Sequence, residues 1–178
     1  PDLVWIKGRS HADLHLLYDS SRGAGKFLRT ESTAAENTGG YGLTAFNSDG
    51  FRTNAYAYSN ENTHTYVAWQ WKANGGTTSS NTDGNITATV QANPTAGFSI
   101  VTYTGNGVQT GKTVGHGLGA VPKMIISKDR GATSNVATWR TYHEAIGNTK
   151  YLQMPQTDAA SVFNDWDNTT PTSSVYSV

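Results

Sequence analysis

Residues 1–9 of the chain are PDLVWIKGR, and residues 122–130 are PKMIISKDR. Pro, Lys and Arg are identical between the two segments, and the aliphatic positions carry conservative exchanges. After a shift of three residues, YDSSRGAGKFLRT at 18–30 aligns with YHEAIGNTKYLQM at 142–154 without a gap. The two pairs share seven identities in 22 positions, which predicts an internal repeat with a period of about 121–124 residues.

This repeat predicts three parts of the chain. Residues 1–72 form a first copy that starts partway through its unit, and residues 97–178 form a second copy that breaks off before its end. Residues 73–96 are low in bulky side chains and rich in Gly, Ser, Thr and Asn, so they are predicted to form a connector. By analogy between the copies, a strand like residues 65–72 is expected after Val178, and a strand like residues 97–104 is expected before Pro1. The chain is therefore expected to be a segment of a longer tandem array of this repeat.

The composition favours β structure and excludes several classes of protein. Gly, Ser, Thr and Asn make up 73 of the 178 residues; Thr suits a pleated sheet, while Gly and Asn supply tight turns. The formal net charge is zero, without a basic block, so the chain lacks an electrostatic footprint for nucleic acid or anionic lipid. Cysteine is absent, which excludes disulfides and thiolate metal sites. No apolar run approaches the length of a membrane span.

The predicted strands are short and bounded by turn-forming residues. They include residues 3–7, 15–18, 26–29, 66–71, 99–104, 123–128, 137–142 and 150–154. Strands of this length and spacing favour an all-β fold, an antiparallel β-sandwich or jelly roll in tandem modules, over a parallel sheet. Only residues 33–36 and 142–146 could form helix. Neither segment has sustained helical periodicity, so each is limited to a turn or two.

The strand at residues 66–71 gives the main core prediction. Strand alternation places Val67, Trp69 and Trp71 on one face. Two indoles bury a large apolar area, so these three side chains are expected in the core. Val4 and Ile6 are expected to be further core residues of the same kind.

Residues 164–168, NDWDN, form the first candidate binding site. In an extended segment Asp165 and Asp167 lie on one side and Trp166 on the other. The two carboxylates could bind Ca²⁺ through hard oxygen ligands, or the indole could stack on a sugar. The alternative is a solvated loop with one anchoring aromatic residue. No other cofactor or metal is expected.

Tyr56 and Tyr58 form the second candidate site. They alternate with Ala55 and Ala57, so one face of this segment is aromatic. Such a face could be a sugar-stacking platform, or it could be a core edge or an inter-subunit contact, because aromatic rings serve all these roles.

No motif supports catalysis. The Gly111-Lys112-Thr113 triplet lacks the first glycine of a P-loop, because Asn106 occupies that position. His116 lies in the glycine-rich run VGHGLGAVP, where a structural bend is favoured over a base because no orienting partner lies at motif spacing. A Gly-x-Ser-x-Gly nucleophile motif is absent as well. The chain is therefore expected not to be an enzyme.

The repeated segments, together with NSDGF at 47–51, YVAWQWKA at 66–73, GFSIVTYTGNG at 97–107, GHGLGAVPKMIISKDR at 115–130 and PTSSVYSV at 171–178, suggest a family. In this order they resemble a repeat of large structural proteins of marine tailed bacteriophages, above all tail-fibre and other virion proteins of phages that infect cyanobacteria and other ocean bacteria. The similarity runs almost end to end and is weakest through residues 75–93 and 164–170. The family often carries Cys where Gln70 stands here. The resemblance implies a concanavalin-like or jelly-roll sandwich at the virion surface.

The leading hypothesis is a virion structural protein, a tail-fibre or surface-appendage module involved in host attachment. Its expected partners are other copies of itself and other virion proteins, in an extracellular setting. The alternative is a lectin-like module that recognises host surface glycan. A polysaccharide depolymerase is a third hypothesis, which requires two carboxylates across a groove.

Overall fold

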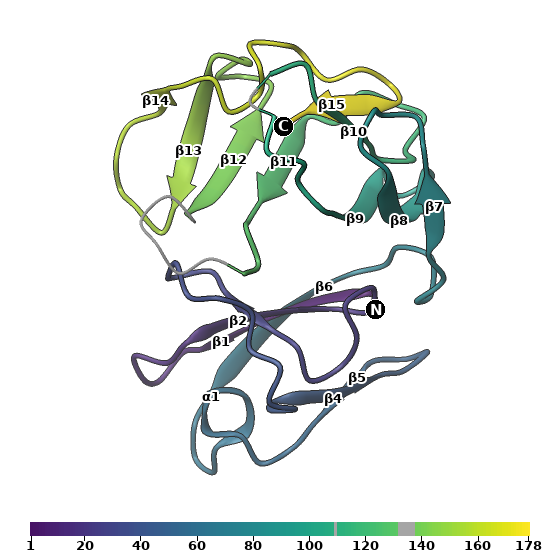
Figure 1. Ribbon diagram of the computed structural model, residues 1–178. Helices are drawn as coiled ribbons and strands as arrows, with labels where there is room; N and C mark the ends of the chain where they lie inside the picture. Colours follow the sequence, from purple (N-terminus) through teal and green to yellow (C-terminus); the bar gives the residue numbers. More distant parts are fainter. Residues whose placement is uncertain (109, 132–137) are drawn as a thin grey trace. The chain divides into compact units, whose positions relative to one another are not determined.

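The computed structural model describes residues 1–108, 110–131 and 138–178. Among these residues, fifteen strands form several antiparallel sheets, and the one helix, α1 (Ala57–Asn60), is a single turn (Figure 1). The all-β prediction is therefore confirmed. No helix within the described ranges is long and apolar enough to cross a bilayer.

The chain divides into two compact units. Unit 1 contains Pro1–Gly76 together with Asp129–Thr138, and unit 2 contains Thr77–Lys128 together with Trp139–Val178. The predicted connector at 73–96 is wrong at two places, because β7 (Ser79–Asn81) and β8 (Ala88–Asn93) lie within it. Alternating small apolar residues on β8, which are too few to signal a core by bulk, are buried in unit 2.

Unit 1 is built on a four-stranded antiparallel sheet in the order β3-β2-β1-β6. Its strands are β1 (Leu3–Gly8), β2 (His15–Asp19), β3 (Leu28–Arg29) and β6 (Tyr66–Trp71). The hairpin of β4 (Leu43–Phe46) and β5 (Phe51–Thr53) adds a second, two-stranded sheet. One face of the larger sheet contributes most of the core, which consists of Val4, Ile6, Leu16, Tyr18, Phe27 and Leu43.

The described residues of unit 2 form three sheets. The first has the order β11-β12-β13-β14, formed by β11 (Met124–Ser127), β12 (Trp139–His143), β13 (Lys150–Met154) and β14 (Ser161–Val162). The second joins β7 and β8 to β9 (Phe98–Tyr103), and the third pairs β10 (Thr113–Gly115) with β15 (Val175–Ser177). The core of unit 2 consists of Ile86, Ala88, Val90, Val114 and Tyr176.

The two segments that align in sequence form meanders with the same strand register. When two residues of the first segment pair across neighbouring strands, their sequence counterparts in the second segment also pair. This holds for three successive strand pairings. The matched pairs are Val4–Tyr18 with Ile125–Tyr142, Leu17–Leu28 with Thr141–Leu152, and Phe27–Asn37 with Tyr151–Ser161. Because a slip of one residue would turn every side chain to the opposite face, this shared register places aligned residues on equivalent faces of the two sheets. Burial still differs between the sheets, since Trp139 is 3% exposed whereas its counterpart His15 is half-buried.

The prediction that Trp69 and Trp71 lie in the core is wrong, since they are 47% and 40% exposed. Val67, on the same face, is only half-buried. The partner strand explains the error: Ile6 of β1, which is 2% exposed, pairs with Ala68, so it is Ala68 that faces the core. Alternation separates two faces of a strand but does not indicate which face is buried. The prediction for Val4 and Ile6, by contrast, is confirmed.

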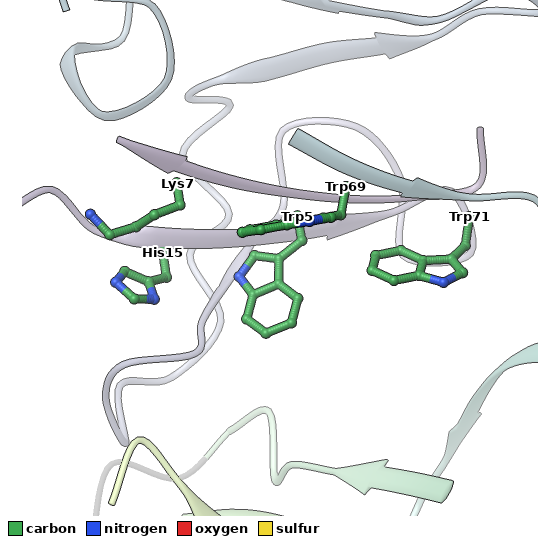
Figure 2. A pocket seen from close by; sticks show the side chains of 5 residues that line it. All are labelled: Trp5, Lys7, His15, Trp69 and Trp71. Atoms are coloured by element: carbon green, nitrogen blue, oxygen red, sulfur yellow. The ribbon is translucent and has the colours of Figure 1, made fainter. Parts of the chain in front are cut away.

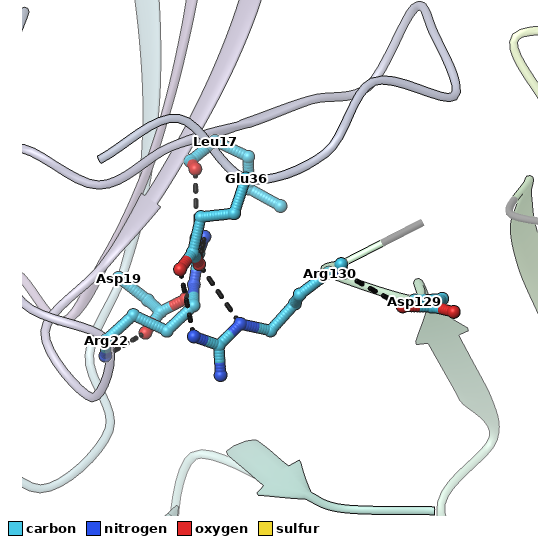
Figure 3. A network of polar contacts seen from close by, with 7 residues as sticks. Leu17, Asp19, Arg22, Glu36, Asp129 and Arg130 are labelled. Atoms are coloured by element: carbon cyan, nitrogen blue, oxygen red, sulfur yellow. Dashed lines mark hydrogen bonds and ion pairs between the residues drawn. The ribbon is translucent and has the colours of Figure 1, made fainter. Parts of the chain in front are cut away.

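A buried charge network braces unit 1. The Arg22 guanidinium donates hydrogen bonds to the Asp19 carboxylate, to Glu36 Oε2 (2.8 Å) and to the Leu17 carbonyl oxygen (3.0 Å). Arg130 donates to both oxygens of Glu36, so this carboxylate lies between two guanidinium groups (Figure 3). Burial alone would raise the pKa of Glu36, but the hydrogen bonds from Arg130 and Arg22 outweigh it and hold the pKa below its ordinary value.

Candidate functional site

The outer face of the unit 1 sheet carries three indoles. Trp5, Trp69 and Trp71 project to the same side of β1 and β6, beside Lys7 and His15 (Figure 2). The register produces this grouping, because Trp5 pairs with Trp69 across β1 and β6 while Lys7 pairs with His15 across β1 and β2. The five side chains line an open depression of about 460 Å³. We call them the indole face.

Two of the three indoles are in contact. The rings of Trp5 and Trp69 are 5.8 Å apart between centroids and inclined by 59°. Trp5 is half-buried, and its Nε1 is buried without a hydrogen-bond partner among the described residues. Large aromatic side chains that remain exposed together mark an interaction surface more often than a random surface position.

One end of the indole face is polar. Lys7 Nζ donates hydrogen bonds to the carbonyl oxygens of Gly8 (2.5 Å) and His11 (3.5 Å), and the ammonium group points away from the indole rings (Figure 2). Burial, and then the positive charge of Lys7, lower the pKa of His15 despite the opposing effect of Glu31. The imidazole is therefore neutral near pH 7, and Lys7 supplies the positive charge of this site.

This arrangement suits a ligand that is apolar on one face and polar at its edge. Indole rings present flat apolar surfaces that stack on rings or on C–H groups. The Lys7 ammonium group and the His15 imidazole can form hydrogen bonds with hydroxyl or carboxylate oxygens at the rim. The site shows no pair of facing carboxylates, because its lining contains neither Asp nor Glu.

Trp166, predicted as a sugar-stacking residue, is buried instead. It is 3% exposed, its Nε1 donates a hydrogen bond to the Lys150 carbonyl oxygen (3.1 Å), and its ring meets Tyr142 edge-on at 5.8 Å. The segment is a turn rather than the extended segment assumed from the sequence, and Asp167 has a positive φ of 48°. The structure therefore makes Trp166 the anchoring aromatic residue of a loop.

The two carboxylates beside Trp166 have separate neighbours. Asp165 lies 3.7 Å from Arg140 Nε; burial raises the pKa of Asp165, and Arg140 opposes that shift. Asp167 Oδ2 accepts a hydrogen bond from the Gly111 amide (2.8 Å). In the parts of the chain that are described, no group of three or more His, Asp or Glu side chains is arranged to hold a metal ion. The described geometry therefore does not support a Ca²⁺ site.

Tyr56 and Tyr58 pack against the edge of the unit 1 core. Tyr56 stacks on Tyr41 at 5.1 Å and meets Tyr58 edge-on at 5.3 Å. Their predicted strand alternation is wrong, because α1 begins at Ala57. Both rings are half-buried, and their packing corresponds to the core-edge alternative rather than to an open platform.

His116 also takes its structural role. The side chain is 2% exposed, Nδ1 accepts a hydrogen bond from the Leu118 amide (3.2 Å), and Nε2 lies 3.2 Å from the Thr172 carbonyl oxygen. Burial lowers the pKa of His116, against the opposing hydrogen bond to Thr172. The ring is thus a neutral link across the bend of the glycine-rich run.

Sequence reasoning missed the indole face because it placed Trp69 and Trp71 in the core. A usable signal was present in PDLVWIK, where Leu3, Trp5 and Lys7 share one face of a strand and Val4 and Ile6 share the other. The charge on the first face and the unbroken aliphatic character of the second indicate which is exposed.

The fold and the site define an all-β protein that exposes an aromatic sheet face in its first unit. The chain belongs to the family described as "Domain of unknown function (DUF7483)", whose model matches residues 1–178. Neither a curated protein nor a solved structure matches the chain.

Proposed function

We propose that the chain is a virion structural module, part of a tail fibre or surface appendage, that contributes to host attachment. The ordered motifs that resemble marine phage structural proteins support this setting. The shared register of the two meanders supports a finer architecture as well, namely two sandwich or jelly-roll modules in tandem. The proposed partners are other copies of the chain, other virion proteins and the host surface.

The indole face is the observation that carries the attachment role. A protein that served only as a spacer would gain nothing from exposing Trp69 and Trp71, whose rings make the surface prone to association. An exposed set of aromatic rings with a polar rim is instead typical of a recognition surface. The proposed module is accordingly non-catalytic and acts by binding.

Carbohydrate recognition through the indole face is the second candidate function. The shallow depression fits an extended ligand, and Trp69 and Trp71 occupy alternate positions of one strand, so a sugar chain can contact both. Lys7 and His15 lie where ring hydroxyl groups or a carboxylate would meet the protein. The neutral net charge of the chain fits recognition by stacking and hydrogen bonds rather than by a broad electrostatic field.

A glycan array probed with the full chain, with and without added Ca²⁺, tests this candidate. We expect binding to surface polysaccharides that does not require Ca²⁺. Loss of one stacking ring in Trp69→Ala should weaken binding about tenfold, in line with the energy of a single aromatic contact. Trp166→Phe, a control in unit 2, should leave binding unchanged. An array without signal would remove the carbohydrate function, and equal losses in both variants would remove the assignment to the indole face.

The virion role is tested separately by the state of assembly. Light scattering of the protein should reveal a multimer, as expected for a fibre or a regular surface array. A strictly monomeric particle at micromolar concentration would contradict the appendage role, whatever the glycan array shows.

A further inference from the structure

β11 differs from its counterpart β1 in one respect. β1 lies between β2 and β6, whereas β11 pairs with β12 and with no other strand among the described residues. The two meanders share their register, so the edge of β11 that corresponds to the β6 side of β1 is open. An open strand edge presents unpaired backbone N–H and C=O groups, which can pair with another strand.

The hydrogen-bond pattern shows which backbone groups face the open edge. The Lys123 carbonyl oxygen accepts from the Glu144 amide (2.9 Å), as the Asp2 carbonyl oxygen does from the Ser20 amide (2.8 Å) at the equivalent position. Alternate residues of an antiparallel strand bond to opposite neighbours. Ile125 therefore bonds to β12, while the backbone groups of the residues on either side of it point to the open edge.

Those two flanking residues, Met124 and Ile126, also expose apolar side chains. They are 53% and 43% exposed. Their counterparts in unit 1 are Leu3 and Trp5, which lie opposite Trp71 and Trp69 of β6. The edge thus offers both the backbone groups and the apolar side chains that β1 uses to hold β6.

We infer that the β11 edge is a docking site for an extended strand of the β6 type, supplied by another copy of the repeated unit. The added strand would run antiparallel to β11 and set its bulky apolar side chains opposite Met124 and Ile126, as β6 does on β1. The inference goes beyond the proposed function, because it concerns how units join and holds whether or not the indole face binds glycan.

A peptide of residues 65–74, TYVAWQWKAN, is the probe, added to the isotopically labelled full chain. We expect amide exchange at Met124 and Ile126 to slow at least tenfold, while the Ile125 amide, which already bonds to β12, changes little. Protection confined to β1 in unit 1 would overturn the inference, because the peptide would then only be replacing β6.

Backbone methylation of the peptide provides a matched control. In the β1–β6 pairing, Val67 and Trp69 lie opposite Lys7 and Trp5 and point their amides at β1, whereas the amide of Ala68 points away. A peptide N-methylated at the Val67 and Trp69 positions should lose binding, and one methylated at the Ala68 position should retain it. Equal binding of both peptides would show apolar adhesion without strand pairing and would refute the site.

A substitution on the protein locates the site independently. Ile126→Lys adds a charge of the kind that protects natural strand edges, and should weaken peptide binding about tenfold. Its control is Val162→Lys, because Val162 is 75% exposed and also lies in unit 2, on β14. Should V162K weaken binding as much as I126K, the peptide would not be docking on β11.

Discussion

Replacement of Glu36 by Gln tests whether the buried charge network holds unit 1 together. The Glu36 side chain is 9% exposed and accepts hydrogen bonds from Arg22 and Arg130. Glu36→Gln keeps the size of the side chain and one oxygen acceptor, but removes the negative charge between the two guanidinium groups. Arg22 is 3% exposed in its side chain, so its charge cannot be compensated by water.

The expected loss follows from the burial of the two contacts. Breaking a buried ion pair by removing one partner costs about 3–5 kcal/mol. Arg130 is 46% exposed in its side chain, so its share is close to that of a surface pair, at most about 1 kcal/mol. Asp19 stays paired with Arg22, which moderates the loss. We therefore expect E36Q to lower the free energy of unfolding of unit 1 by about 3 kcal/mol.

Amide hydrogen exchange under native conditions measures this change unit by unit. Protection of the β2 amides should fall in E36Q, while protection of the β12 amides in unit 2 should not. The control is Glu144→Gln, because Glu144 pairs with Lys123 at 3.0 Å with both side chains at least 50% exposed. An exposed pair of this kind contributes about 0–1 kcal/mol.

The pH dependence has a defined sign. The pKa of Glu36 in the folded protein lies below its ordinary value of 4.5, so the unfolded chain binds the proton more readily. The stabilisation from Glu36 is therefore present above pH 4.5 and is lost as the pH falls through the lower folded value. The difference in the free energy of unfolding of unit 1 between wild type and E36Q should therefore become smaller as the pH falls below 4.5. Losses relative to wild type at pH 7 that agree within about 0.5 kcal/mol, for unit 1 in E36Q and for unit 2 in E144Q, would refute the reasoning.

Two further predictions concern the buried His116 and the glycine at position 42. The pKa of His116 in the folded protein lies below its ordinary value of 6.5, so its contribution to the stability of unit 2 is present above pH 6.5 and decreases below it. His116→Asn should flatten the acid dependence of β12 amide protection, and an unchanged slope would contradict the assignment. Gly42 has φ +78°, and an added Cβ would lie 1.9 Å from Tyr18 Oη, so Gly42→Ala should destabilise unit 1 by at least about 1–3 kcal/mol in urea unfolding. Gly50→Ala, where the added methyl group meets no described atom within 4 Å, should change stability by less than about 0.5 kcal/mol.

Local sequence pattern was sufficient to predict the main strands of the two meanders but not β7 and β8. The strands predicted at 3–7, 15–18 and 66–71 match β1, β2 and β6 within a residue at each end, because each combines β-forming residues with flanking turns. β7 was missed because Ser and Asn lend it no apolar signal, and β8 was missed because its apolar residues are small and few. Their place in a sheet depends on pairing with β9, which is a tertiary effect.

The candidate sites failed for a related reason. Trp166 was a candidate for sugar stacking because an extended segment would place its indole opposite two carboxylates, yet its indole N–H donates a hydrogen bond to the Lys150 carbonyl oxygen. Trp69 looked like a core residue because of its size, yet the small Ala68 beside it has the inward position. The burial of an aromatic ring depends on the partner strand and on what lies beyond it, and the sequence of the ring's own strand does not encode either.

The two meanders separate framework from surface. Tyr18 and Tyr142 lie at equivalent positions, and both are buried, with exposed fractions of 0% and 3%. Each packs against an aromatic residue of its own unit. The outer positions differ: the counterpart of Trp5 is Ile126, so unit 2 has no indole at that point of its sheet. The register keeps aligned residues on equivalent faces of the two sheets, whereas exposed positions such as these can change at little cost in stability. If the indole face binds glycan, loss of binding in W69A should therefore leave the unfolding free energy of unit 2 untouched, and recognition would be a property of the first unit alone.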